Sequence, residues 1–202
     1  MTKRNYWKIL ALLALFSTAL VSAAHAQYKE KTPMNEALTF NADGAKRNPN
    51  IHWPHGFHPE QAELFAHNEI VIHATCETVF TNLIDAEKWP SWYSNSKDIK
   101  LLNSPDGKLG QDTHFTWETF GVPISSRVHE FVPDSRLGWF GDGPGMSAYH
   151  TFLLLKTEHG CHVVTEEVVK GPGAIDFRKN QPSEMHDKHQ LWLTSLKERA
   201  EK

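Results

Sequence analysis

The sequence has few cysteines, no excess of basic residues and only one long apolar run. Its two cysteines, Cys76 and Cys161, allow at most one disulfide within the chain. The 21 Lys and Arg residues are outnumbered by 24 Asp and Glu residues, a balance that argues against a nucleic-acid partner or an anionic lipid surface. The sequence also lacks a nucleophile elbow, a phosphate-binding loop and a metal-site signature, so no catalytic motif assigns an activity.

The one long apolar run lies near the N-terminus, where residues 1–26 have the features of a signal peptide. Three basic residues precede the mostly apolar residues 9–21, and residues 24–26 (AHA) form a small-x-small cleavage site. As a helix, the apolar stretch would rise only about 20 Å, which is short for a membrane span. No cysteine lies near the cleavage site, which argues against a lipoprotein anchor. We therefore expect cleavage after Ala26 and a periplasmic or secreted protein without a membrane span.

The composition of the remaining chain is that of a mildly acidic globular protein. Removal of the first 26 residues would change the formal charge from −3 to −6, because this segment carries three basic and no acidic residues. The chain is 22% charged and has 202 residues, which fits one folded domain plus an arm. The seven tryptophans of the full sequence suit either an aromatic-rich core or a lined pocket. We expect a monomer.

Residues 27–68 are expected to form an N-terminal arm. The segment is polar, contains four scattered prolines and has no long apolar period, so we expect it to pack along the outside of the domain or across a pocket mouth. It also contains His52, His55 and His58, and histidine is the commonest metal ligand. Because prolines and a glycine interrupt the triplet, no helix can align the three rings. The sequence therefore favours surface histidines over a metal site, and we assign no metal and no cofactor.

The stretch Glu69–Tyr93 predicts a strand, a helix and a tryptophan-rich corner. A period of two over residues 70–73 is typical of a strand. Thr75 can accept a hydrogen bond from the free N–H groups at the start of a helix. Pro90 ends this helix. Its apolar face consists of Val79, Phe80, Leu83 and Ile84.

This order resembles the opening of the START-like superfamily, also called the SRPBCC group of polyketide cyclases/dehydrases and lipid-transport proteins. The resemblance covers about Glu69–Glu198, with Cys76 at a place where such sequences often have proline. It implies an α+β helix-grip fold at residues 69–202, in which a curved antiparallel sheet of about six to seven strands wraps around a long C-terminal helix. The residues that carry the resemblance are Ala74, Val79, Phe80, Leu83, Asp85, Trp89, Pro90 and Trp92.

Alternation and turn signals place the remaining elements. Residues 141–145 are expected to be a loop too glycine-rich to pair, and a linker of about ten residues is expected after residues 171–173. Ser183 is expected to cap a final helix that ends near Glu198. The strands are expected at residues 98–102, 113–120, 122–131, 136–140, 146–156 and 161–170. The final helix carries one stripe of Met185, His189, Trp192, Leu193 and Leu196.

The resemblance implies a cavity between sheet and helix that binds a hydrophobic or aromatic small molecule or a lipid. The same side chains would alternatively fill a solid core. Other possible functions are a cyclase/dehydrase-like enzyme, with His150 and Glu167 or Glu166 as acid and base, and a partner-binding periplasmic protein. The candidate ligand-binding residues are Trp117, Trp139, His150, Phe152, Leu154, Glu167, His189, Trp192 and Leu196.

The resemblance also implies a disulfide between Cys76 and Cys161. In this fold the first and last strands are antiparallel neighbours, so the end of one meets the beginning of the other. The two cysteines would then fall within the Cα separation of about 4.4–6.8 Å that a disulfide requires. An oxidising compartment favours the bridge, and the alternative is two buried free thiols.

Overall fold

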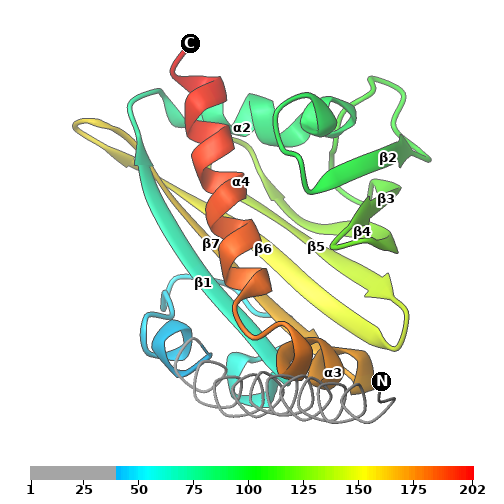
Figure 1. Ribbon diagram of the computed structural model, residues 1–202. Helices are drawn as coiled ribbons and strands as arrows, with labels where there is room; N and C mark the ends of the chain where they lie inside the picture. The colour runs from blue at the N-terminus through cyan, green and yellow to red at the C-terminus, as the bar shows by residue number, and fades with distance from the viewer. Residues whose placement is uncertain (1–39) are drawn as a thin grey trace, which may run out of the picture.

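The computed structural model describes residues 40–202, so the predicted signal peptide and the beginning of the predicted arm lie outside the described residues. The chain forms a seven-stranded antiparallel sheet with a long C-terminal helix across one face (Figure 1). The strand order is β1-β7-β6-β5-β4-β3-β2, so the first and last strands in sequence are neighbours. This is the α+β layout expected from the sequence. Within residues 40–202, no helix is long and apolar enough to cross a membrane.

Most elements lie where the sequence predicts them. The strands are β1 (Leu64–Ile72), β2 (Ser96–Leu101), β3 (His114–Thr119), β4 (Val122–Val132), β5 (Arg136–Gly143), β6 (Met146–Thr157) and β7 (Gly160–Lys170). The α-helices with both ends described are α2 (Cys76–Ile84), α3 (Pro172–Asn180) and α4 (Glu184–Ala200), residues 40–45 are also helical, and the short 3₁₀ helices are η1 (Pro59–Gln61) and η2 (Ala86–Ser91).

Helix α2 begins as its sequence predicts. The Thr75 hydroxyl accepts a hydrogen bond from the Thr78 backbone N–H at 3.1 Å, which satisfies one of the free donors of the first turn. After the helix ends, the Trp89 indole N–H donates to the Leu83 carbonyl oxygen at 3.0 Å. This bond fixes the tryptophan-rich corner against the last turn of α2. Trp89 is thereby held in the core, where it is fully buried.

The predicted stripe of α4 is the face that this helix buries against β1 and α2, since its five residues are the helix's buried side chains. Ser183 is the N-cap residue of α4, as predicted, but its side chain does not make the capping bond. Its hydroxyl donates to the Asp187 carboxylate at 2.8 Å instead of accepting from a backbone N–H.

Three predicted boundaries are wrong. Strand β1 begins at Leu64, because the segment before Glu69 continues the ladder with β7. Residues 141–143 are part of β5, not a loop: a Cβ at Gly141 or Gly143 would lie only 3.2 or 2.7 Å from the Ile124 side chain, so these glycines make room for Ile124. Residues 172–180 form α3 where a linker was expected, with a proline in its first turn, where its missing N–H costs nothing.

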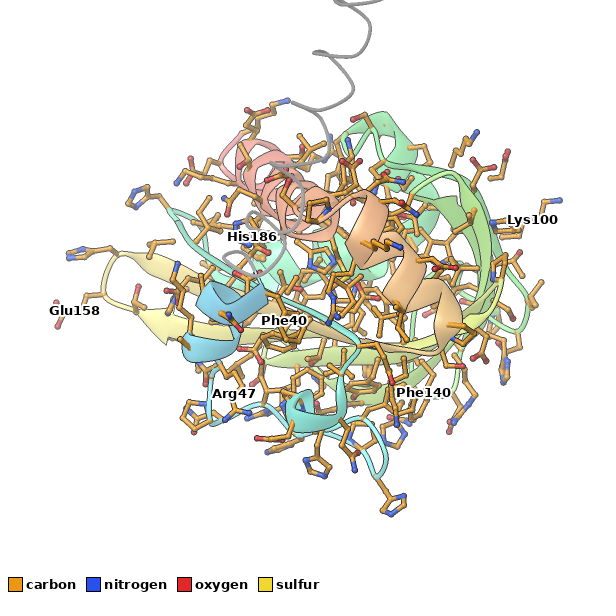
Figure 2. All side chains as sticks on the ribbon, turned by 60° about the horizontal axis from the view of Figure 1, so that its bottom comes forward. Phe40, Arg47, Lys100, Phe140, Glu158 and His186 are labelled. Carbon is orange, nitrogen blue, oxygen red and sulfur yellow. A yellow bond between two sulfur atoms is a disulfide. The ribbon has the colours of Figure 1, made fainter. Side chains whose placement is uncertain are left out.

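The arm around Trp53 and Phe57 packs along the outside of the sheet, on the face opposite α4, whereas its beginning lies beside the helices, where Asp43 hydrogen-bonds to His186 of α4. Trp53 lies against Phe65 and Tyr149, with ring centroids 6.3 and 6.1 Å apart. Phe57 lies 5.4 Å from Phe140, which Figure 2 labels. The sheet is therefore covered on both faces, and β6 is buried continuously from Tyr149 to Leu154.

A buried polar pair lies under the arm. His67 Nδ1 and Glu166 Oε1 are 2.7 Å apart, and both side chains are almost completely buried. The backbone N–H of Asn48 donates to the same Glu166 oxygen at 2.6 Å. Glu166 thus joins the arm to the sheet on the outer face, away from the helix side.

The predicted disulfide between Cys76 and Cys161 is present, with a Cα–Cα separation of 5.0 Å. It connects the start of α2 to the start of β7. The register of the two strands explains the proximity, because Ile72 at the end of β1 lies directly opposite Cys161.

Candidate functional site

An apolar cavity of about 170 Å³ lies between the sheet and the helices α3 and α4. It occupies the end of the strands at which Leu64 of β1 faces Val169 of β7, far along both strands from the disulfide. Its lining is formed by Leu64, Trp117, Thr119, Phe120, Val122, Ile124, Trp139, Gly141, Met146, Ala148, His150, Glu167, Val169, Phe177, Gln181, Met185, His189 and Trp192.

The structure brings six of the nine predicted binding residues to this cavity, and three do not line it. The three others, Phe152, Leu154 and Leu196, belong to the packed core that continues from the cavity tryptophans toward the disulfide, and the rings of Phe152 and Trp192 are 5.3 Å apart. The space beneath them is filled by α2 and η2. The sequence left open a ligand cavity or a solid core, and each applies to a different part of the molecule. The core is solid near the disulfide and hollow near α3. The six lining residues are Trp117, Trp139, His150, Glu167, His189 and Trp192.

The tryptophans at the inner end of the cavity are stabilised by one another. Trp89 lies beneath them, with ring centroids 5.0 Å from Trp192, 5.5 Å from Trp117 and 5.9 Å from Trp139. Tyr93 stacks on Trp192 at 4.5 Å. Such aromatic pairs are worth about 0.5–1.5 kcal/mol each beyond the burial of their area. The inner wall of the cavity is therefore a packed, preformed surface.

Three polar side chains meet at one side of the cavity. His150 of β6 and Glu167 of β7 are direct partners in the β6–β7 register, and His189 reaches them from α4. His189 Nε2 lies 2.9 Å from Glu167 Oε2, and His150 Nδ1 lies 4.0 Å from the same oxygen. The two imidazole rings are stacked, with centroids 4.6 Å apart and planes 17° apart.

The hydrogen bonds of His150 assign its tautomer. The Thr165 hydroxyl donates to the Thr151 carbonyl oxygen at 3.1 Å, and it lies 2.7 Å from His150 Nε2. A hydroxyl has one hydrogen, so Nε2 must carry the proton of the second bond and donate it to Thr165. Burial, together with the neighbouring His189, lowers the pKa of His150 well below its ordinary value. His150 is therefore a neutral ring whose Nδ1 is an acceptor.

The three groups offer ligand atoms that lie within 4.8 Å of one another, the composition of a divalent metal site. However, a metal ion binds in the plane of each imidazole ring. Two nearly parallel stacked rings share no such point, so His150 or His189 would have to turn before both could hold one ion. As arranged, the cluster suits hydrogen bonding better than metal binding.

The arm histidines lie elsewhere. His52, His55 and His58 are all exposed on the outside of the molecule. His52 Nδ1 lies 2.7 Å from a Glu130 carboxylate oxygen. In the part of the chain that the structure describes, none of the three belongs to a group of potential metal ligands.

The outer end of the cavity is bordered by residues that the sequence did not single out. Phe120 contacts Phe177 of α3, with ring centroids 5.6 Å apart, and Gln181 beside them is exposed. Phe120 has φ = 52° and Gly121 has φ = 75°, so the two residues form the tight turn between β3 and β4 with both in left-handed conformation. Phe177 was missed because it falls in the segment expected to be a linker.

No protein-family model and no curated protein matches the sequence. Among solved structures, a hypothetical protein from Helicobacter pylori is similar with a TM-score of 0.70 and 29% identity, covering 77% of this chain and 98% of that one. The di-domain ARO/CYC protein StfQ from the steffimycin biosynthetic pathway has a TM-score of 0.57 and 13% identity, covering 68% of this chain and 50% of that one. A START superfamily protein from Mycobacterium smegmatis has a TM-score of 0.54 and 14% identity, covering 68% and 97%.

The similarity to StfQ and to the mycobacterial protein is one of fold, since both are below 25% identical to this chain. The chain has the START-like fold, as the sequence predicted. This fold is consistent with the binding of a hydrophobic ligand between sheet and helix, where the cavity lies.

Proposed function

We propose that this protein binds a small apolar or aromatic molecule in the cavity between the sheet and α4. The observation that carries the proposal is the cavity itself, which has mostly apolar walls and a few polar groups at one side. Binding sites for small molecules have this composition, in which apolar walls give affinity and a few polar groups fix orientation. The similarity in fold to the ARO/CYC and START proteins supports the proposal, because this fold is consistent with the binding of a hydrophobic ligand.

The size of the cavity favours a ligand of about one ring over a lipid. An apolar cavity of about 150 Å³ is known to take up benzene, and drug-sized ligands occupy about 300–1,000 Å³. A cavity of about 170 Å³ therefore suits one aromatic ring or a short chain. A long acyl chain would require α3 to move away from the sheet.

Export to the periplasm is part of the proposal. The N-terminal sequence supports it, with a basic start, an apolar stretch and a small-x-small site before Gln27. The disulfide agrees with it, because such bonds persist mainly in oxidising compartments.

Native mass spectrometry of protein purified from the periplasm tests the proposal. We expect a bound small molecule that is released on denaturation. Ala148→Leu should fill the cavity and abolish binding of this molecule, because Ala148 lines the cavity wall. Ala45→Leu, the same change at an exposed position of the arm, is the matched control and should retain the ligand. Absence of any bound molecule, or equal amounts in both variants, would contradict the proposal.

A further inference from the structure

We infer that the ligand is a ring that carries a neutral hydroxyl group, a phenol, and that this hydroxyl donates to the Glu167 and His150 side of the cavity. The inference rests on the proposed function and adds the chemical class of the ligand. It depends on which atoms of the polar cluster can accept or donate a hydrogen bond.

The cluster presents acceptors to the cavity. Nδ1 of His150 is unprotonated, because the single proton of the neutral ring is on Nε2 and is bound to Thr165. In residues 40–202, no group donates to this Nδ1 at hydrogen-bond distance. A Glu167 carboxylate has about four acceptor positions, and His189 Nε2 lies 2.9 Å from one of its oxygens. Two acceptor atoms 4.0 Å apart, Nδ1 of His150 and Oε2 of Glu167, thus belong to side chains that line a mostly apolar cavity. The lining also includes the polar residues Thr119 and Gln181, and the indole N–H of Trp192, which has no hydrogen-bond partner among the described residues.

Because the two acceptor atoms lack a donor, we expect the cavity to bind rings without a hydrogen-bond donor less tightly than rings that carry one. A plain hydrocarbon would cover the acceptors without pairing them, and burying unpaired polar groups is costly. A ring with a carboxylate would place a second negative charge beside Glu167, in surroundings that screen charges poorly. A ring with a hydroxyl group avoids both problems, because the hydroxyl is uncharged and donates a hydrogen bond to one of the acceptors.

A neutral donor fits better than a cation. The His189 ring already lies 2.9 Å from Glu167, so the carboxylate has a polar partner before any ligand enters. An ammonium ligand would have to give up its hydration for a carboxylate that is already shared. Trp117, Trp139 and Trp192 give the wall flat aromatic surface beside its aliphatic side chains, which suits the ring of a phenol.

Three probes of nearly the same shape test the inference on the purified protein. They are p-cresol, which has the hydroxyl, toluene, which lacks it, and p-toluate, which has a carboxylate in its place. Dissociation constants are measured at pH 7.5 by calorimetry or by NMR titration. We expect p-cresol to bind at least about tenfold more tightly than toluene, because a hydrogen bond to a charged group has about that value. We expect p-toluate to bind more weakly than p-cresol.

A variant of the acceptor separates the hydroxyl contact from burial of the ring. Glu167→Gln removes the charge with almost no change in shape and should weaken p-cresol binding several-fold while leaving toluene binding unchanged. Glu158→Gln makes the same chemical change in the exposed β6–β7 turn (Figure 2), at the other end of these strands from the cavity, and should alter neither constant. If the first variant fails to fold, the comparison of probes on the unmodified protein still decides.

The outcomes separate the two proposals. Equal binding of toluene and p-cresol, or tighter binding of p-toluate, would overturn the hydroxyl inference and leave the proposed function standing. If none of the three rings binds, the proposed function fails and the inference fails with it.

Discussion

At the residue scale, sequence reasoning found the polar side of the cavity but not its arrangement. Alternation along β6 and β7 placed His150 and Glu167 on strand faces, and helical spacing placed His189 on the buried stripe. The sequence could not show that these three residues meet, because their proximity depends on the β6–β7 register and on where α4 crosses the sheet. For the same reason Phe152 shares a strand face with His150 but lies in the solid core.

The neutral state of His150 makes a testable contribution to the pH dependence of stability. Its pKa in the folded protein lies well below the value of about 6.5 in an unfolded chain. As the pH falls below about 6.5, the unfolded state therefore takes up a proton that the folded state does not. We expect the free energy of unfolding to decrease from pH 7.5 to pH 5. His150→Gln, which keeps an N–H donor for Thr165, should reduce this decrease.

Urea denaturation of both proteins at the two pH values measures the effect. His55→Gln, at an exposed arm position, is the control and should leave the pH dependence unchanged. His186 acts in the opposite direction, because its hydrogen bond with Asp43 raises its pKa and stabilises the folded state at low pH. Since His186 is present in every variant, its contribution cancels in the comparison. An identical decrease in His150→Gln would show that His150 is not held neutral by the fold.

At the element scale, the sequence predicted the regular strands and the two main helices, because each has a clear period and a recognisable start. It missed α3 and misplaced the glycine-containing end of β5. Both depend on neighbours in space: α3 covers the cavity, and the β5 glycines make room for Ile124 of the adjacent strand. The turn at Phe120–Gly121 was located by its glycine, but the left-handed Phe120 was unexpected, since a bulky residue rarely adopts that conformation.

The strained Phe120 indicates a role at the mouth of the cavity, and its replacement tests this role. Asn-Gly is the preferred pair for this type of turn, so Phe120→Asn should relieve about 1 kcal/mol of strain. The variant also loses the contact with Phe177, so we expect little net change in stability. Association and dissociation of p-cresol, followed by stopped-flow fluorescence, should both become faster because the ring no longer covers the opening.

A matched change on the other face of the sheet is the control. Phe57→Asn removes an aromatic ring that packs against Phe140 under the arm, away from the mouth. It should leave both rates unchanged. Unchanged rates in Phe120→Asn as well would mean that the ligand enters by another route.

At the scale of the whole molecule, the resemblance to the START-like superfamily predicted the fold. The position of the arm was the hardest part to predict from the sequence. Trp53 and Phe57 were expected to anchor the arm on the outside of the domain or across a pocket mouth, but they have no periodic context, so the sequence could not show which face of the sheet they cover. The buried His67–Glu166 pair beneath the arm was equally hidden, because it joins positions far apart in the chain. The disulfide could be predicted because the antiparallel pairing of β1 and β7 follows from the fold itself.

The disulfide should stabilise the whole chain without affecting the cavity. It joins residues separated by 85 positions, and a loop of this size corresponds to about 4–5 kcal/mol on the chain-entropy description, as an upper value. Reductant should therefore lower the free energy of unfolding measured with urea by up to this amount. The affinity for p-cresol in the absence of urea should not change. Two reactive thiols in protein denatured without reductant would contradict the bridge.

The disulfide lies at one end of the molecule and the cavity at the other. The bridged end, around Cys161, has a solid core, whereas the hollow end is closed mainly by α3 and the turn at Phe120. Transient opening of the hollow end can let a molecule in or out while the bridged end stays intact. The residence time of a ligand is then set by local fluctuations rather than by global unfolding. Evolution could lengthen or shorten that residence time through α3 alone, without changing the temperature at which the protein melts.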